Sequence, residues 1–182
     1  MIRGKNIILR ALEPADAAPY HRFINDEESN FTRGLFLPTS TVEAESYIAN
    51  EAKSCAERLT LAIELEYSTF IGLIGLRNIC SRSRRAELWI YIGDKDNTKK
   101  GYGSDAIRTI CNYGFDSMNL NRIWLECDPG YPKIMNAYQK VGFVLEGTLR
   151  QSYYRRGEYR DTCIMGLLRE SWEKHSKTGI SS

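Results

Sequence analysis

A short segment with two lysines and two glycines is the part of this sequence best suited to hold a charged ligand. It reads Lys99-Lys100-Gly101-Tyr102-Gly103-Ser104 and lies between a predicted strand and a predicted helix. Glycines let the backbone approach closely and point successive N–H groups one way, and the following helix adds the positive end of its dipole. The segment therefore predicts a diphosphate-binding turn, although an ordinary glycine-rich connection would have the same composition.

Two other phosphate-binding motifs are absent from the sequence. No GxxxxGK[ST] occurs, and no GxGxxG follows the first predicted strand. Nucleoside triphosphate hydrolysis and dinucleotide binding therefore have no local support.

The cysteines and histidines do not form the pattern of a metal site or a disulfide framework. The five cysteines are odd in number, no two form a CxxC pair, and the two histidines, His21 and His175, lie at opposite ends of the chain. Structural zinc sites need closely spaced ligands, and disulfide frameworks need paired cysteines. We therefore expect no metal, and reduced thiols of the kind found in cytoplasmic proteins. Cys127 has no neighbouring histidine that could activate it as a nucleophile.

Length and charge set further limits. The chain has 182 residues, with 25 Lys and Arg against 23 Asp and Glu, and a net charge of +2. That length is typical of one domain, and the balanced charge argues against a protein that coats nucleic acid. No apolar run approaches the roughly 20 residues of a membrane span, and the first residues lack the apolar core of a signal peptide. We therefore expect a cytoplasmic protein that does not contact a membrane.

The first half of the chain predicts strands and helices in alternation and then a meander. An apolar run at 6–12 predicts a strand, and a helix follows from Pro14 to about residue 25. Residues 25–36 are polar and predict a loop, after which Ser40 or Thr41 is expected to cap a second helix. Alternating polar and apolar residues then predict antiparallel strands at 59–65, 70–76 and 86–92.

The second half predicts a strand and helix alternation that ends in two strands. The expected elements are a helix over 106–115, a strand at 122–127, a helix at 132–141, and strands at 143–149 and 161–168. No repeat and no linker divides the chain. We therefore expect one domain over residues 1–172, with a frayed tail at 173–182.

Segments along nearly the whole chain carry a known family pattern. They are Ile7-Ile8-Leu9-Arg10, Ala86-Glu87-Leu88-Trp89-Ile90-Tyr91-Ile92, Lys100-Gly101-Tyr102-Gly103, Ala137-Tyr138-Gln139-Lys140-Val141-Gly142-Phe143, and Tyr159-Arg160-Asp161 with Met165-Gly166-Leu167-Leu168-Arg169-Glu170. In this order and spacing they resemble the GNAT superfamily of acetyl-CoA-dependent N-acetyltransferases, in particular its ribosomal-protein N-acetyltransferase-like branch.

The resemblance implies an α/β (α+β) fold of the GNAT acyl-CoA N-acyltransferase type, with a central mixed, mostly antiparallel, splayed sheet flanked by helices. It implies that the turn from Lys99 to Ser104 binds the diphosphate of acetyl-CoA. It also implies that the strand end at Ile90, Tyr91 and Ile92 pairs with the pantetheine arm and supplies the oxyanion donor. The acetyl group would pass directly from the thioester to a primary amine, with acetyl-CoA as cosubstrate.

By the same resemblance, Tyr138 and Glu87 are the catalytic candidates. Tyr138 matches a tyrosine that protonates the departing thiolate, and a phenol with an ordinary pKa of about 10 is protonated at neutral pH. Glu87 matches an acidic residue that serves as a base, usually through water. Tyr138 could instead be a core aromatic, and Glu87 could instead pair with Arg84 or Arg85.

Three positions depart from the family pattern. Thr98 stands where members often carry Gln or Arg, so Lys100 is expected to supply the charge instead. Tyr131 stands seven residues before Tyr138, where an Asn commonly bonds the CoA arm, and Ile134 replaces a Ser or Ala. The resemblance therefore supports cofactor contacts from the turn and leaves open whether the helix at 132–141 also contacts CoA.

The acceptor is poorly specified. By family analogy the loop at 25–36 and the hairpin at 153–159 border the acceptor mouth. The expected partner is a primary amine of a protein N-terminus, a polyamine or an aminosugar, with selectivity set by these loops or by a second copy in a homodimer. Two other classes stay open: a non-catalytic acetyl-CoA-binding or sensing module, and an RNA-associated protein, which the small net charge disfavours. The RNA contacts would be Arg150, Arg155 and Arg156.

Overall fold

A computed structural model describes residues 1–26, 37–155 and 157–178 of the chain. The strands within them are β1 (Ile2–Arg3), β2 (Ile8–Arg10), β3 (Leu59–Leu65), β4 (Thr69–Cys80), β5 (Arg85–Ile92), β6 (Arg122–Cys127), β7 (Val144–Arg155) and β8 (Glu158–Leu168). The α-helices are α1 (Ala17–Ile24), α3 (Thr41–Glu51), α4 (Tyr102–Asp116), α5 (Pro132–Val141) and α6 (Arg169–Thr178). Short 3-10 helices are η1 (Pro14–Asp16), η2 (Glu66–Ser68) and η3 (Lys95–Asn97).

The strands form one mixed sheet in the order β1-β2-β3-β4-β5-β6-β8-β7. The β5–β6 pair is parallel, whereas the pairs β1–β2, β2–β3, β3–β4, β6–β8 and β7–β8 are antiparallel. The mixed, mostly antiparallel sheet with flanking helices confirms the predicted fold class.

The chain divides into two compact units. The first comprises residues 1–76 and 90–110, and the second comprises residues 77–89 and 111–182. The elements β4, β5 and α4 therefore contribute residues to both units.

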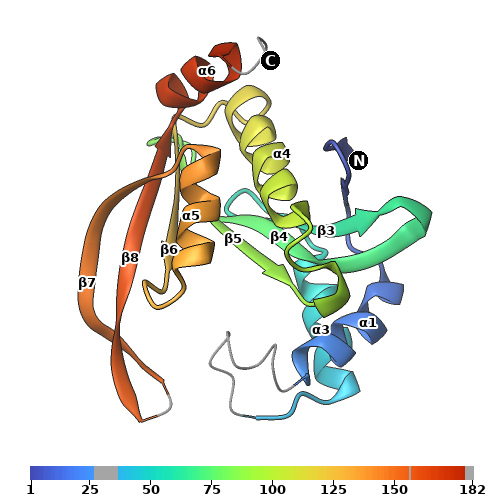
Figure 1. Cartoon of the computed structure of the whole chain (residues 1–182). Helices are drawn as coiled ribbons and strands as arrows, with labels where there is room; N and C mark the ends of the chain where they lie inside the picture. Colours follow the sequence, from blue (N-terminus) through green and yellow to red (C-terminus); the bar gives the residue numbers. More distant parts are fainter. Residues whose placement is uncertain (27–36, 156, 179–182) are drawn as a thin grey trace. The chain divides into compact units, whose positions relative to one another are not determined.

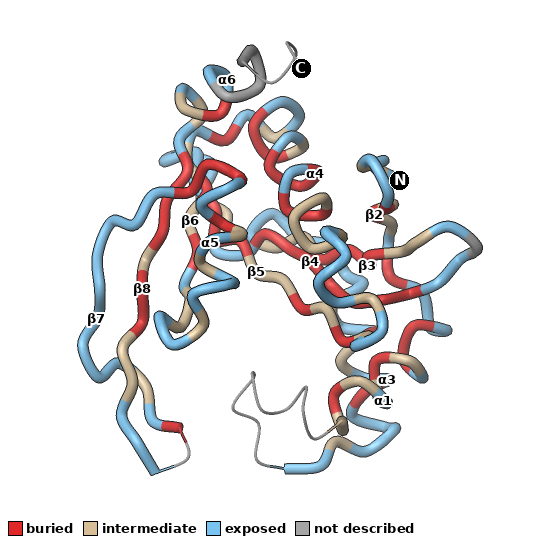
Figure 2. The backbone as a smooth tube through the Cα atoms, in the orientation of Figure 1, coloured by how far each residue is buried: buried red, intermediate tan, exposed pale blue. Residues whose placement is uncertain are grey.

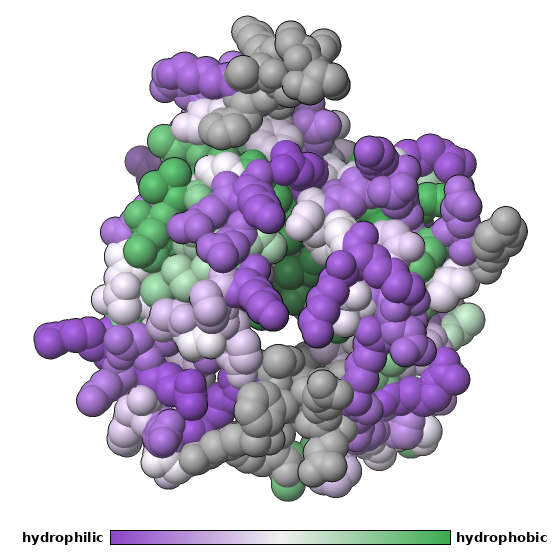
Figure 3. Space-filling model, in the orientation of Figure 1, coloured by the Kyte–Doolittle hydropathy of each residue, from purple (hydrophilic) through white to green (hydrophobic). Residues whose placement is uncertain are grey.

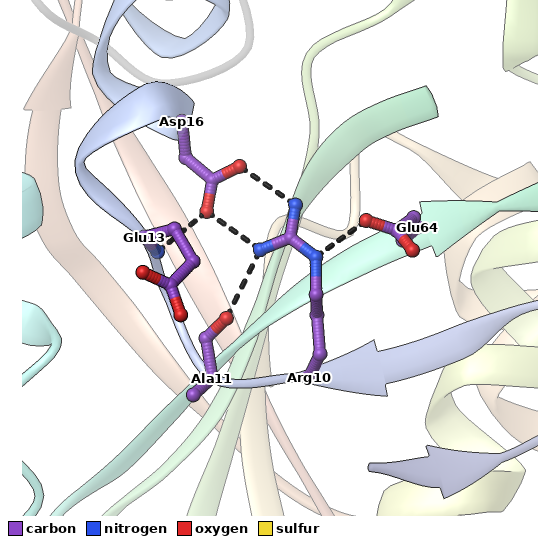
Figure 4. Close-up of polar contacts among 5 residues, drawn as sticks. All are labelled: Arg10, Ala11, Glu13, Asp16 and Glu64. Atoms are coloured by element: carbon purple, nitrogen blue, oxygen red, sulfur yellow. Dashed lines mark hydrogen bonds and ion pairs between the residues drawn. The ribbon is translucent and has the colours of Figure 1, made fainter. Parts of the chain in front are cut away.

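In the first unit, Arg10 ties β2 to the start of α1 and to β3 (Figure 4). Its guanidinium donates to both carboxylate oxygens of Asp16 at 2.8 Å, to the carbonyl oxygen of Ala11 at 3.0 Å, and to Glu64. Asp16 also accepts from the amide of Glu13 at 2.9 Å. The hydrogen bond to Asp16 is the main reason that the pKa of Arg10 is raised above its ordinary value. These bonds fix η1 and the start of α1 against the sheet.

The two helices after β2 are set by a cap and by an aromatic pair. The Ser40 hydroxyl accepts from the amide of Glu43 at 3.1 Å, and the Glu43 carboxylate accepts from the amide of Ser40 at 2.8 Å. This reciprocal capping box makes Ser40, and not Thr41, the residue that caps α3. Tyr20 of α1 stacks on Tyr47 of α3 with ring centroids 4.9 Å apart.

In the second unit, α5 packs on one face of β6 and β8 (Figure 1). Leu167 of β8 lies directly opposite Ile123 of β6, and Met165 lies opposite Leu125. All four side chains are buried. A β-carbon built on Gly142, at the end of α5, would lie 3.3 Å from Cδ1 of Leu167. The face that carries Ile123 and Leu125 is therefore the one that α5 covers.

The edge strand β7 is exposed along nearly all of its length (Figure 2). Its pairing with β8 is interrupted between Leu145 and Gly147 and between Leu149 and Tyr153, and Gln151 has a φ of 49°. Such irregularities bend an edge strand and discourage another strand from pairing with it. Figure 3 shows apolar side chains on the side where β7 lies, and the exposed apolar residues of this strand include Val144, Leu145 and Leu149.

Parts of the second unit differ from the sequence prediction. The prediction ended one strand at 149 and began the next at 161, whereas pairing between Arg155 and Glu158 extends both. α6 was not predicted because its residues are mostly polar. Tertiary contacts hold it: the Trp172 ring packs 6.0 Å from that of Phe115, and its Nε1 donates to Oδ1 of Asn112 at 3.0 Å. Residues 173–178, which we expected to be a frayed tail, continue this helix.

Candidate functional site

The glycine-containing turn opens α4 in the first unit. Lys99 and Gly101 have φ angles of 63° and 88°, in the left-handed region that glycine adopts without steric cost. A β-carbon on Gly101 would meet none of the described atoms within 4 Å, so the backbone angle, and not space, calls for glycine there. The turn is open to solvent: residues 99–101 are exposed and residues 102–104 are half-buried.

The first amides of α4 precede the intrahelical hydrogen bonds. The first helical hydrogen bond runs from the amide of Asp105 to the carbonyl oxygen of Gly101 at 3.0 Å. The amides of residues 102–104 precede it and point out of the helix end, as the first amides of an α-helix do. With the positive end of the helix dipole, they form a cradle for an anion such as a phosphate group.

Two lysines flank this cradle. The carboxylate of Asp94 caps η3 and accepts from Nδ2 of Asn97 at 2.8 Å. Asn97 in turn accepts from Nζ of Lys100 at 3.2 Å, so this ammonium is held beside the turn. Lys99 is exposed. Both charges are therefore placed where they would favour an anionic ligand.

The end of β5 lies beside the same turn. A β-carbon on Gly103 would lie 3.9 Å from Cγ1 of Ile92 and 4.0 Å from Cδ1 of Ile90. A β-carbon on Gly72 of β4 would collide with the carbonyl oxygen of Tyr91, so the peptide of Tyr91 faces β4. Because peptide groups alternate along a strand, those of Ile90 and Ile92 face away from β4. The structure thus brings the predicted cofactor residues together, with Tyr91 directed to the neighbouring strand.

Asp105 connects the turn to the amino-terminal strands. Its two carboxylate oxygens accept from the amides of Lys5 at 3.0 Å and Asn6 at 2.6 Å. A β-carbon on Gly4 would lie 2.6 Å from Oγ1 of Thr109, so only glycine permits this approach to α4. The sequence alone does not reveal these supports, because an aspartate in the first turn of a helix signals only that a helix begins.

Tyr138 is a buried phenol on the inner side of α5. Its ring meets that of Phe143 edge-on, with centroids 6.0 Å apart. Burial, with a smaller contribution from Cys127, raises the pKa of Tyr138 to about 12. The phenol is therefore protonated across the neutral pH range and can donate a proton. Packing and proton donation are compatible here, so the core-aromatic interpretation does not exclude the catalytic one.

Glu87 of β5 is a buried carboxylate with both oxygens occupied. Oε1 accepts from Nε of Arg77 at 2.9 Å and also from its Nη2, and Oε2 accepts from Nδ2 of Asn78 at 2.8 Å. The ion-pair partner of Glu87 is Arg77 of the neighbouring strand β4. It is not Arg84 or Arg85, the partners that the sequence suggested. The sequence alone could not predict this ion pair, because Arg77 reaches Glu87 from the neighbouring strand.

Tyr138 and Glu87 lie on opposite faces of the sheet within the second unit. Glu87 is the register partner of Trp124 in β6, and register partners share a face. Cys127, at an odd spacing from Trp124, points to the other face. Cys127 also contributes to the pKa of Tyr138, which places the two close together on the face that α5 covers. In this arrangement the Tyr138 hydroxyl and the Glu87 carboxylate would act on different atoms of a bound substrate.

The pairing of β5 with β6 stops beside Glu87. The register partners are Arg85 with Arg122, Ala86 with Ile123, and Glu87 with Trp124. These three pairs lie within the second unit, and the remaining residues of β5, from Ile90 to Ile92, belong to the first unit.

Cys127 does not have the properties of a nucleophile. Burial is the main cause that raises the pKa of its thiol to about 11, with Cys163 and Asp128 contributing. A thiol in this state carries little thiolate at neutral pH.

In the described part of the chain, no three His, Cys, Asp or Glu side chains are grouped as a metal ion would require. Within the same residues, none of the helices combines the length and apolar character of a membrane span.

The segments expected to border the acceptor are partly described. Residues 27–36 of the first loop lie outside the described residues, and so does Arg156 of the hairpin. Arg155 is only 6% exposed, and its Nη1 lies 3.6 Å from Oδ2 of Asp128. Its charge is therefore committed inside the protein, which removes it from the arginines that could bind RNA. Arg150 is exposed.

A family model described as an acetyltransferase (GNAT) domain matches residues 6–144 of the chain. Among curated proteins, the chain is similar to the putative ribosomal N-acetyltransferase YdaF of Bacillus subtilis, with 28% identity over 93% of this chain and 95% of the relative. It is also similar to spermidine N(1)-acetyltransferase of Vibrio cholerae, with 28% identity over 96% and 99% of the two chains.

Solved structures agree with these similarities. The spermidine N-acetyltransferase of Vibrio cholerae in complex with CoA and spermine superposes with a TM-score of 0.83 at 27% identity, over 92% of this chain and 98% of the other. A dodecameric structure of the Vibrio cholerae enzyme superposes with a TM-score of 0.78 at 27% identity, over 94% and 98% of the chains.

Proposed function

The chain belongs to the GNAT family of acetyl-CoA-dependent N-acetyltransferases, and from this premise we propose that it acetylates a primary amine of a small polycationic molecule. The observation that carries the proposal is the junction of two backbone features in the first unit. Gly103, in the first turn of α4, lies against the side chains of Ile90 and Ile92, whose peptides face away from β4. One feature suits a diphosphate, and the other suits an extended amide-bearing chain. CoA contains both.

The cofactor contacts in this proposal come mainly from the backbone. The amides from Lys100 to Ser104 hold the diphosphate, and Lys99 and Lys100 add charge at its edge. Ile90 and Ile92 pair with the pantetheine arm, and one of their amides donates to the oxyanion of the tetrahedral intermediate. Tyr91 contributes packing only, because its carbonyl faces β4 and its ring meets that of Tyr20 edge-on at 6.4 Å.

In this proposal Tyr138 is the general acid. Collapse of the tetrahedral intermediate releases a thiolate, which takes the proton of the Tyr138 hydroxyl as the carbon–sulfur bond breaks. The raised pKa of Tyr138, about 12, keeps the proton in place until that step. The phenolate then recovers a proton from solvent.

Glu87 acts in this proposal as a base through water. Each carboxylate oxygen can accept more than one hydrogen bond, so Oε2, which accepts from Asn78 alone among the described side chains, has capacity for a water molecule. The ammonium of the acceptor must lose a proton before its nitrogen can attack the thioester. A water relay to Glu87 lies on the face of the sheet opposite Tyr138. The proton lost by the acceptor ammonium would therefore leave by a different route from the proton that Tyr138 gives to the thiolate.

The acceptor class is proposed from the relatives. The Vibrio cholerae relative is named for spermidine, and its structure was solved with spermine. The name of the Bacillus subtilis relative supports a second candidate, the amino terminus of a ribosomal protein. The dodecameric neighbour also supports self-association of this chain, which light scattering on the purified protein would measure.

A thiol-release assay with acetyl-CoA and an amine panel tests the proposal. The panel contains spermidine, spermine, putrescine, glucosamine and a peptide with a free amino terminus. We expect the highest kcat/KM for the polyamines. Preference for the peptide would transfer the proposal to the second candidate. Tight acetyl-CoA binding without acetylation of any amine would favour the sensing module and overturn the proposed function.

A further inference from the structure

The half-buried carboxylate of Asp128 gathers three groups at the carboxyl end of β6. Oδ2 of Asp128 accepts from the hydroxyl of Tyr153 at 2.5 Å and lies 3.6 Å from Nη1 of Arg155. Oδ1 accepts from the amide of Gly130 at 2.7 Å. The Arg155 guanidinium also lies over the ring of Tyr131, 5.7 Å from its centroid. These five residues are called the Asp128 cluster.

The cluster joins two segments that are distant in the sequence. Asp128, Gly130 and Tyr131 form the turn from β6 into α5, and Tyr153 and Arg155 belong to β7. Asp128 and Arg155 are 14% and 7% exposed at their side chains. Shielded polar groups that bond to one another hold a fixed geometry, because breaking a bond leaves the Asp128 carboxylate or the Tyr153 hydroxyl without its partner.

The start of α5 has little else to hold it. Within α5, whose residues are all described, the buried residues are Tyr138 and Val141, near its carboxyl end. Tyr131 precedes the helix and makes no side-chain cap, so the first turn lacks the usual stabilisation. Stacking of Tyr131 under Arg155 and the Asp128 hydrogen bonds take its place. Packing therefore holds the carboxyl half of α5, and the Asp128 cluster holds the amino half.

We propose that the Asp128 cluster is a positioning device for acetyl transfer, which sets the direction of α5 and thereby the place of the Tyr138 hydroxyl. The inference rests on the proposed function of Tyr138 as general acid. A proton donor must lie within hydrogen-bond distance of the leaving sulfur, and a misplacement of about 1 Å can lower a rate by about 100-fold. Tyr153 and Arg155 act through Tyr138 and touch no reacting atom.

The substitution Tyr153→Phe tests the cluster with the smallest change. It removes one hydroxyl and keeps the ring, so the hairpin should still fold. We expect kcat to fall about tenfold while KM for acetyl-CoA stays within about twofold, because the diphosphate turn is untouched. Asp128→Asn should lower kcat at least as much, and circular dichroism and thermal unfolding establish whether each variant is folded.

A second charged link between β6 and β7 provides a matched control. Arg122, at the start of β6, forms a two-pronged ion pair with Glu146 of β7 at 2.5 Å. It joins the same strands at the end remote from the start of α5, beside Gly166 and on the face of the sheet that α5 does not cover. Glu146→Gln should leave kcat within about twofold of the unmodified protein. An equal loss of kcat in Glu146→Gln and Tyr153→Phe would overturn the proposal, because general loosening of β7 would then explain both.

A double-mutant cycle separates positioning of Tyr138 from a merely structural role. In a Tyr138→Phe background, Tyr153→Phe should change kcat by less than about twofold, because the group it positions is gone. A persistent tenfold loss in that background would contradict the proposal. So would an unchanged kcat for Tyr153→Phe in the unmodified protein.

A spectroscopic measurement keeps this test separate from the proposed function. With carbon-13-labelled tyrosine, the Tyr138 ring signal, assigned by its loss in Tyr138→Phe, should shift in Tyr153→Phe and stay in place in Glu146→Gln. If the unmodified protein acetylates no amine, the proposed function fails while this signal still reports on positioning. If the protein is active and the signal does not respond to Tyr153→Phe, positioning fails while the function stands.

Discussion

Two turns in this molecule lead from a strand region into a helix, and they use opposite means. The turn at 98–104 before α4 keeps its side chains at the surface and leaves the first amides of the helix outside the helical ladder. The turn at 128–131 before α5 is closed by the side chains of Asp128, Tyr153 and Arg155. One turn is open to a ligand, and the other is filled by the protein itself.

This difference explains why the two turns contribute differently to the proposed reaction. An open helix amino terminus offers preformed donors at no cost in rearrangement, which suits binding. A closed turn is occupied by the protein's own side chains and holds the helix in place, which suits positioning of a catalytic group. Substitutions in the first turn should therefore act on acetyl-CoA affinity, and substitutions around the second should act on kcat.

The largest expected effect is that of Gly103→Glu. The new carboxylate would stand beside Ile90 and Ile92, at the amides proposed to hold the diphosphate, and would repel its charge. We expect the Kd for acetyl-CoA, measured by calorimetry, to rise at least about 100-fold, or about 2.7 kcal/mol. Gly147→Glu is the matched control, since a β-carbon there meets none of the described atoms within 4 Å. Unchanged affinity in Gly103→Glu would remove the turn from the cofactor site.

Tyr138→Phe should have the next largest effect. Loss of the proton donor should lower kcat about 30-fold and leave KM for acetyl-CoA nearly unchanged, since water replaces the phenol poorly. Steady-state kinetics with the best amine of the panel measure both constants. Tyr113→Phe, on α4, is the control for loss of a tyrosine hydroxyl. If turnover in Tyr138→Phe matches that of the control, another group protonates the thiolate.

Glycine-to-alanine substitutions compare the two turns directly. Gly101→Ala introduces strain at a φ of 88°, which costs about 1 kcal/mol. It should raise the Kd for acetyl-CoA about threefold, with kcat unchanged. In Gly130→Ala, the β-carbon would lie 2.9 Å from Oδ1 of Asp128, so the cluster must shift. It should lower kcat about threefold, with the Kd unchanged. The same pattern in both variants would show that the turns are not separate in function.

A smaller effect is expected in alkaline titration. Burial raises the pKa of Tyr138 to about 12, so the folded protein holds this proton more tightly than the unfolded chain, whose tyrosines titrate near 10. This residue should therefore leave stability unchanged below about pH 10 and lower it progressively between about pH 10 and 12. Tyrosinate absorbance of the unmodified protein and of Tyr138→Phe should coincide up to about pH 11. Divergence below pH 10 would mean that Tyr138 is exposed to solvent.

The smallest effect is expected for Arg150→Gln. Arg150 is exposed on the edge strand, and Arg155 is committed to the Asp128 cluster. We expect kcat/KM to stay within about twofold, and filter binding to show no salt-sensitive affinity for RNA in either protein. Tight RNA binding by the unmodified protein that is lost in Arg150→Gln would restore the RNA-associated alternative.

Local patterns predicted much of the fold. The period-two alternation at 59–65 and the apolar run at 122–127 gave β3 and β6 at their observed bounds, and Pro132 and Gly142 marked the ends of α5. These elements were predictable because their signals lie within a few neighbouring residues. β1 and the long ends of β7 and β8 pair with nearby residues, but they were not predicted because β1 has only two residues and the ends of β7 and β8 are mostly exposed. α6 was not predicted because the contacts that hold it come from far along the chain. Trp172 against Phe115 is one such contact.

The sequence by itself determined the open turn, since two glycines, two lysines and a following helix are a local arrangement. The tertiary structure decided the surroundings of the catalytic candidates. It paired Glu87 with Arg77 and Asn78 and buried Tyr138 beside Cys127. It also placed Glu87 and Tyr138 on opposite faces of the sheet. It also gathered Tyr153 and Arg155 around Asp128. Backbone geometry is set by nearby residues. Burial, charge pairing and the face of the sheet on which a side chain lies depend on which distant strands become neighbours.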